Sequence, residues 1–142
     1  MAASSHTGPW TIALEATQAR LTVHGRRGLR LLHAPPVEGS FYLRPDGALA
    51  GFALRLPLRH GVLRWESADV DRDGRAWLRL RDREVRAPVT VVCAEIPGPR
   101  PYVKIVLDTV FRSAALGLRG ALWPRPVRLR VFSEIRSHRP GP

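Results

Sequence analysis

The chain has 142 residues, 44% of them hydrophobic, and a formal net charge of +11, since 23 Lys and Arg stand against 12 Asp and Glu. This length and hydrophobic fraction predict one compact domain and exclude a disordered basic arm, which lacks the apolar surface that offsets chain entropy. No run approaches the ~18 to 20 apolar residues of a membrane-spanning helix, and polar residues interrupt residues 1–20 where a signal peptide is apolar, so we expect a cytoplasmic protein.

Hydrophobic and polar residues alternate with a period of two from the start of the chain. Leu21 and Val23, for example, alternate with Arg20 and Thr22. This period places one set of side chains in the core of a sheet and the other in solvent. The predicted strands are, in chain order, 10–14, 19–26, 38–44, 48–59, 62–68, 75–81, 85–96, 102–111, and 115–120 with 127–136 as a closing hairpin.

Proline and glycine punctuate these segments. The 13 prolines and 12 glycines are too closely spaced for long helices. Pro57 and Pro88 lie within predicted strands, where they indicate an edge, a bulge or a break, because proline cannot donate a ladder hydrogen bond. The more apolar segments, 85–96 and 102–111, are expected to be central strands.

Short strands separated by turns predict an all-β fold, and we expect a single antiparallel β-barrel of about eight strands. Closure into a barrel would remove exposed strand edges. The barrel domain is expected to span residues 9–136, with flexible tails at residues 1–8 and 137–142.

Several short motifs resemble those of the YceI-like family. Residues 10–12 (WTI) and 38–41 (EGSF) resemble its first strands, and residues 116–120 (LGLRG), followed by 126–131 (PVRLRV), are similar to its closing hairpin. Arg72-Asp73, which begins 16 residues before Pro88, resembles its arginine-aspartate segment. The resemblance implies a lipocalin-like barrel whose elongated apolar lumen holds a polyisoprenoid or a similar lipid chain.

The alternating pattern also defines which side chains face the interior of such a barrel. They would line a lumen for an extended apolar ligand, or simply fill the interior as an ordinary core, because both have the same composition. The predicted inward residues are Leu21, Val23, Phe41, Leu43, Phe52, Leu54, Leu56, Val89, Val91, Ile105, Leu107, Leu129 and Val131.

Motifs for other chemistry are weak. Residues 69–74 (DVDRDG) match the first half of a calcium loop, but Leu80 stands where the bidentate carboxylate belongs, so a solvated hairpin turn with a left-handed Gly74 is favoured. Cys93 cannot form an intramolecular disulfide and is expected to be a small core residue. With no catalytic motif in the sequence, we expect a non-enzymatic protein without a metal or cofactor.

The excess of arginine allows a rival hypothesis, a basic β-module that binds nucleic acid or an anionic lipid surface. Its phosphate contacts would come from the outward residues Arg55, Arg79, Arg81, Arg128 and Arg130. Trp77, in phase with Arg79, would stack on a base or, as we favour, be covered by an arginine of its own chain. Clustering of these arginines into one stripe would favour the rival hypothesis. With the arginines spread over the surface, lipid binding remains the expected function, with peripheral contact to anionic membranes.

Overall fold

A computed structural model describes residues 8–11, 17–25, 28–46, 48–59, 61–99, 102–118 and 125–136. Within these ranges the chain is almost entirely β-structure, which confirms the predicted all-β class. The strands are β1 (Gly8–Thr11), β2 (Thr17–Gly25), β3 (Gly28–His33), β4 (Glu38–Leu43), β5 (Leu49–Leu58), β6 (Gly61–Ser67), β7 (Arg75–Leu80), β8 (Arg83–Pro88), β9 (Thr90–Ile96), β10 (Tyr102–Arg112) and β11 (Pro126–Arg136).

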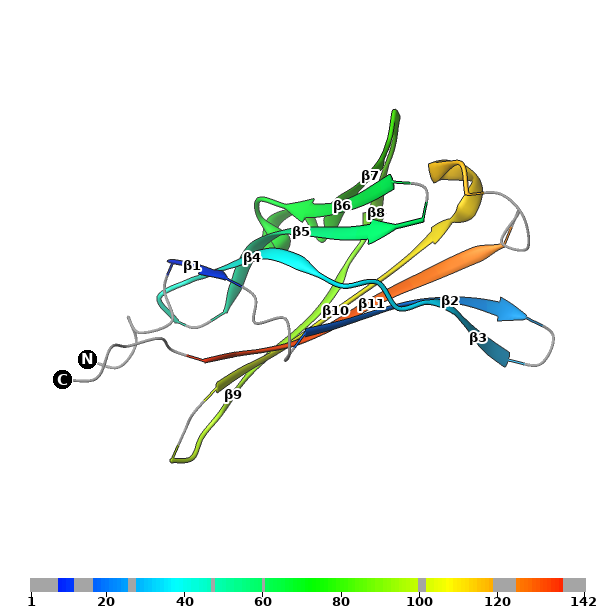
Figure 1. The fold of residues 1–142 in the computed structure, drawn as a ribbon. Helices are drawn as coiled ribbons and strands as arrows, with labels where there is room; N and C mark the ends of the chain where they lie inside the picture. Colours follow the sequence, from blue (N-terminus) through cyan, green and yellow to red (C-terminus); the bar gives the residue numbers. More distant parts are fainter. Residues whose placement is uncertain are drawn as a thin grey trace.

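The strands form two antiparallel sheets that face each other (Figure 1). Sheet A has six strands in the order β1-β4-β5-β6-β7-β8, and sheet B has five in the order β3-β2-β11-β10-β9. Apart from the β1–β4 and β2–β11 pairs, every pair joins two strands that are consecutive in the chain. Among the described residues, no strand of one sheet is paired with a strand of the other.

The chain passes from sheet A to sheet B between β8 and β9, where Val89 alone separates the two strands (Figure 1). The N–H of Val89 donates to the carbonyl of Gly74 (3.0 Å), and Oγ1 of Thr109 donates to the carbonyl of Pro88 (2.7 Å). The prediction of an edge, a bulge or a break at Pro88 is confirmed, because the edge strand β8 ends there. The expectation of a central strand over 85–96 is wrong, because β8 and β9 are each the last strand of their sheet.

Two further expectations need correction. The prediction of a hairpin strand over 115–120 is wrong for its described part, because Ser113–Leu116 forms a 3-10 helix, η3, that ends at the left-handed Gly117 (φ 69°). Residues 119–120 lie outside the described residues. β11 is paired instead with β10 and β2. The strand β3 was not predicted, because its sequence, GLRLLH, does not alternate regularly.

The core lies between the inner faces of the two sheets. On β11, the inward residues Val127, Leu129 and Val131 are fully buried, while Arg128 and Arg130 alternate with them on the outer face. The prediction from the period of two is thus confirmed for this strand. Burying each such side chain contributes roughly 1.5 to 3 kcal/mol to folding, so the two sheets are held together mainly by their apolar inner faces.

A single turn of α-helix, α1 (Val70–Asp73), connects β6 and β7. A side-chain oxygen of Asp69 accepts from the N–H of Arg72 at 3.1 Å and caps this turn, and Gly74 ends it in the left-handed conformation (φ 61°). The predicted role of Gly74 is confirmed. No helix in the described part of the chain is long and apolar enough to cross a membrane.

Of the two expected tails, Gly8 alone belongs to the part of the chain that the structure describes. Residues 1–7 and 137–142 lie outside the described residues, as do residues 12–14 of the first predicted strand. Gly8, expected to belong to the N-terminal tail, is the first residue of β1.

Candidate functional site

The residues predicted to line a lumen lie in the interior, between the two sheets. All of them are buried except Val89 and Val91, which are half-buried and pack against the core. Phe41, Leu107 and Leu129 are 0% exposed. A side chain without exposed surface borders no water-sized void, so the interior around these residues is packed.

β6 contributes two buried polar groups that sequence reasoning did not single out. Nε1 of Trp65 and Oγ of Ser67 have no hydrogen-bond partner among the described residues. The Trp65 ring meets that of Phe52 edge-on, with 5.2 Å between the ring centroids. By contrast, the buried hydroxyls of Thr17 and Ser133 share a hydrogen bond of 2.8 Å. Leaving a buried polar group without a hydrogen bond costs about 1 to 3 kcal/mol. The N–H of Trp65 and the hydroxyl of Ser67 therefore each lower the stability of this part of the interior.

An open cleft of about 380 Å³ lies between the β7–β8 turn and η3. Leu80 and Leu116 in its lining belong to the hydrophobic core, and Leu118 packs against that core. The apolar lining is therefore continuous with the interior. The volume falls within the range of about 300 to 1,000 Å³ that is usual for small-molecule sites.

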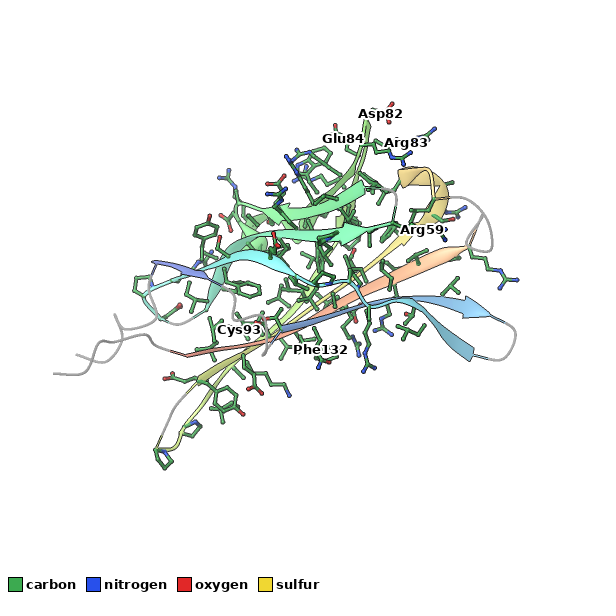
Figure 2. All side chains as sticks on the ribbon, viewed as in Figure 1. Arg59, Asp82, Arg83, Glu84, Cys93 and Phe132 are labelled. Carbon is green, nitrogen blue, oxygen red and sulfur yellow. The ribbon has the colours of Figure 1, made fainter. Side chains whose placement is uncertain are left out.

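Charged residues complete the lining of this cleft. Figure 2 labels Asp82 and Arg83 at the tip of the β7–β8 hairpin. A Cβ atom on Gly117 would lie 3.0 Å from Nε of Arg83, so the arginine side chain lies directly against this glycine. Arg81 stands in the same turn with a left-handed backbone (φ 57°). The cleft combines apolar and basic groups, which suits a ligand with an apolar chain and a polar end.

The five arginines of the rival hypothesis are not brought into one stripe. Arg55 and Arg79 lie on the outer face of sheet A, whereas Arg128 and Arg130 lie on the outer face of sheet B. Arg81 belongs to the β7–β8 turn. The structure brings Arg55 and Arg79 near each other through Arg64, which is paired in register with both. Sequence reasoning missed Arg64, because strand register alone determines its neighbours.

Arg79 makes two ion pairs and a cation–π contact. Its guanidinium donates to Oε1 of Glu66 at 2.5 Å and to Oε2 of Glu84 at 3.1 Å. It also lies 5.1 Å from the ring centroid of Trp77, and the guanidinium of Arg86 lies 5.8 Å from the same centroid. The favoured interpretation of Trp77, an indole covered by arginines of its own chain, is confirmed.

On sheet B, Asp108 joins the two predicted arginines of β11. Nη2 of Arg128 and Nη2 of Arg130 donate to its Oδ2 at 2.6 and 2.7 Å. Burial raises the pKa of Asp108, but the hydrogen bonds and charges of Arg128 and Arg130 outweigh this effect, so that its pKa lies below the usual value. These two arginines are thus already partly neutralised.

The outer face of sheet B also carries apolar side chains. Val92, Val106 and Phe132 lie in one cross-strand row, and Val92 is 53% exposed. Figure 2 shows Phe132 on the side of sheet B that faces away from sheet A. Val110 and Leu31, 53% and 55% exposed, lie in the cross-strand row of Arg128, and the row of Arg130 and Asp108 separates them from Val92 and Phe132.

Comparisons with known proteins give little further information. No protein-family model matches this chain, and no curated protein matches it. Among solved structures, it is similar at 12% sequence identity to a crystal structure of a multidomain protein including DUF1735 from Bacteroides ovatus. The match covers 95% of this chain and 60% of that chain, with a TM-score of 0.29, which is too low to support an argument about fold or function.

Proposed function

We propose that this domain is a non-enzymatic binder of an extended apolar ligand, such as an isoprenoid-like lipid. The observation that carries the proposal is the cleft of about 380 Å³ whose leucine lining continues into the core. The resemblance of the sequence motifs to YceI-like proteins implies the same class of ligand. In this proposal the chain of the ligand packs on Leu118 and on the small exposed parts of Leu80 and Leu116, and its polar end faces Arg83.

The strand order supports a barrel-like arrangement for this function. Following the chain, β4 to β8 are paired consecutively, β9 to β11 likewise, and β11 is paired with β2 at the other end of the chain. Up-and-down barrels have this order. We propose that the domain is such a barrel opened between the edge strands β1 and β3 on one side and β8 and β9 on the other, where its packed interior could widen around a ligand.

The unpaired groups on β6 offer a further contact to a ligand that enters between the sheets. The indole N–H of Trp65 and the hydroxyl of Ser67 are buried without a partner among the described residues. A carbonyl or hydroxyl oxygen on the ligand would accept hydrogen bonds from them and remove the cost of leaving them unpaired.

Displacement of a fluorescent polyene fatty acid by isoprenoid alcohols tests the proposal. Leu118→Trp fills the cleft and should weaken binding at least about tenfold, which corresponds to about 1.4 kcal/mol. Tyr42→Trp is the control, because Tyr42 is exposed on sheet A and lines neither cleft, and it should bind like the wild type. Equal binding by all three proteins would contradict the proposed location of the ligand.

A second candidate function is contact between sheet B and an anionic membrane, which would bring the domain to its lipid. It is favoured by the exposed apolar side chains of Val92, Val110 and Leu31, which lie on the same outer face of sheet B as Arg128 and Arg130. Each cation near such a surface contributes about 1 kcal/mol. Binding of nucleic acid is less well supported, because the predicted arginines are divided between two sheets and a turn.

Co-sedimentation with phosphatidylglycerol vesicles tests the membrane contact. Val92→Glu should reduce the bound fraction several-fold, whereas Tyr42→Glu, at a residue 42% exposed on sheet A, should leave it unchanged. Equal reduction by both variants would show that net charge, and not the face of sheet B, determines binding.

A further inference from the structure

The outer face of sheet A aligns five charged residues in one cross-strand row. The register places Glu38 opposite Arg55, Arg55 opposite Arg64, Arg64 opposite Arg79, and Arg79 opposite Glu84. Directly opposite residues in an antiparallel pair have Cβ atoms about 4.5 to 5.5 Å apart, and like charges in such pairs are destabilising. The three arginines at the centre of the row therefore need nearby negative charge.

Only the third arginine of the row obtains this charge from carboxylates of the described residues. Arg79 is held by Glu66 and Glu84. Arg55 and Arg64 are exposed, and neither makes an ion pair with a described residue, Glu38 included. Two adjacent guanidinium groups are thus left with unmatched charge.

A cleft of about 290 Å³ lies beside these two arginines. Its lining includes Gly39 and Ala53, whose small size leaves the space open, and Glu66, whose charge is already neutralised by Arg79. A Cβ atom on Gly39 would lie 2.0 Å from the carbonyl oxygen of Ala53, so a larger residue cannot occupy this position without moving the strands. The close approach of β4 and β5 thereby fixes the shape of the cleft.

We propose that Arg55 and Arg64 bind a phosphate group in this cleft. Guanidinium groups bind phosphate oxygens with paired hydrogen bonds of fixed geometry. One phosphate between the two side chains would convert the repulsion between them into two attractive contacts. The site shares no residue with the cleft proposed for the apolar ligand, so either site could exist without the other.

Titration with inorganic phosphate and with phenyl phosphate, followed by amide NMR shifts of the full chain, tests this site. Ionic strength is held constant with chloride, because screening alone changes surface electrostatics. We expect saturable shifts in residues 39, 53, 55 and 64. Stronger binding of phenyl phosphate would assign the site to a phosphate ester, and equal binding would assign it to free phosphate.

Variants that each remove one positive charge distinguish phosphate binding in the cleft from attraction to the general positive charge of the surface. Arg55→Gln and Arg64→Gln should each weaken phosphate binding at least tenfold. Arg112→Gln, at an exposed residue of β10 that lines neither cleft, should bind like the wild type. Equal weakening in all three variants, or no saturable shift in the wild type, would overturn the proposal.

Discussion

Buried polar residues show how single side chains set the stability of this domain. Ser67 and Ser133 are both buried between the sheets, 7% and 2% exposed. The hydroxyl of Ser133 has a partner in Thr17, whereas that of Ser67 has none among the described residues. The same chemical group should therefore have opposite effects at the two positions.

Replacing each serine by alanine tests this difference. Ser67→Ala should leave the free energy of unfolding unchanged or raise it by up to about 1 kcal/mol, because it removes an unpaired polar group. Ser133→Ala should lower it by about 0.5 to 1.5 kcal/mol, since it removes the buried hydrogen bond between Ser133 and Thr17. Urea denaturation measures both values, and a larger loss for Ser67→Ala would contradict the account.

Asp108 should make stability depend on pH. Its pKa in the folded state is lowered, so its contribution is fully present above the unfolded pKa of about 3.9 and is lost as the pH falls through the folded value. Asp108→Asn should cost about 1 to 2 kcal/mol at pH 7, because Arg128 and Arg130 lose their charged acceptor.

Unfolding of both proteins at several pH values checks this prediction. The difference between wild type and Asp108→Asn should shrink as the pH falls below about 4. Asp82→Asn, in the exposed β7–β8 turn, is the control and should stay within about 0.5 kcal/mol of the wild type. A difference that is independent of pH would rule out the ionic contribution of Asp108.

At the scale of elements, the pairing of β4 with β5 depends on Gly39. Gly39 and Gly98 have similar positive φ angles of 136° and 146°. A Cβ atom would meet the backbone of Ala53 at Gly39 but no atom within 4 Å at Gly98. A substitution would therefore strain the backbone at both positions, but it would cause a steric clash at Gly39 and none at Gly98.

Alanine at each glycine separates these two effects. Gly98→Ala should cost about 1 to 3 kcal/mol, the usual range for a strained backbone conformation. Gly39→Ala should cost at least about 2 kcal/mol more, because β4 and β5 must separate locally to admit the methyl group. Denaturation midpoints measure both changes, and equal losses would show that the clash is relieved without disturbing the sheet.

The same elements show what the sequence can and cannot predict. The segment 75–81 was predicted almost as β7 is observed, because its alternation and the turns around it are local signals. The role of Arg64 depends on the strands opposite it, which local alternation does not specify. Likewise, the cleft is lined by Leu80 and Leu118, which are far apart in the sequence. Composition and spacing could therefore not locate it.

At the scale of the whole molecule, the charge of +11 is spread over both sheets and partly neutralised. Arg79, Arg128 and Arg130 are each bound to a carboxylate. The apolar side chains are concentrated between the sheets, and three of them, Leu80, Leu116 and Leu118, line the cleft beside η3. We propose that this cleft is the site of the apolar ligand.

Native mass spectrometry of the gently purified full chain tests this claim most directly. We expect a lipid to co-purify, or to bind when isoprenoid alcohols are added, and to be retained by Tyr42→Trp but lost from Leu118→Trp. A bare mass for the wild type both before and after the addition of isoprenoid alcohols and fatty acids would contradict the proposed function.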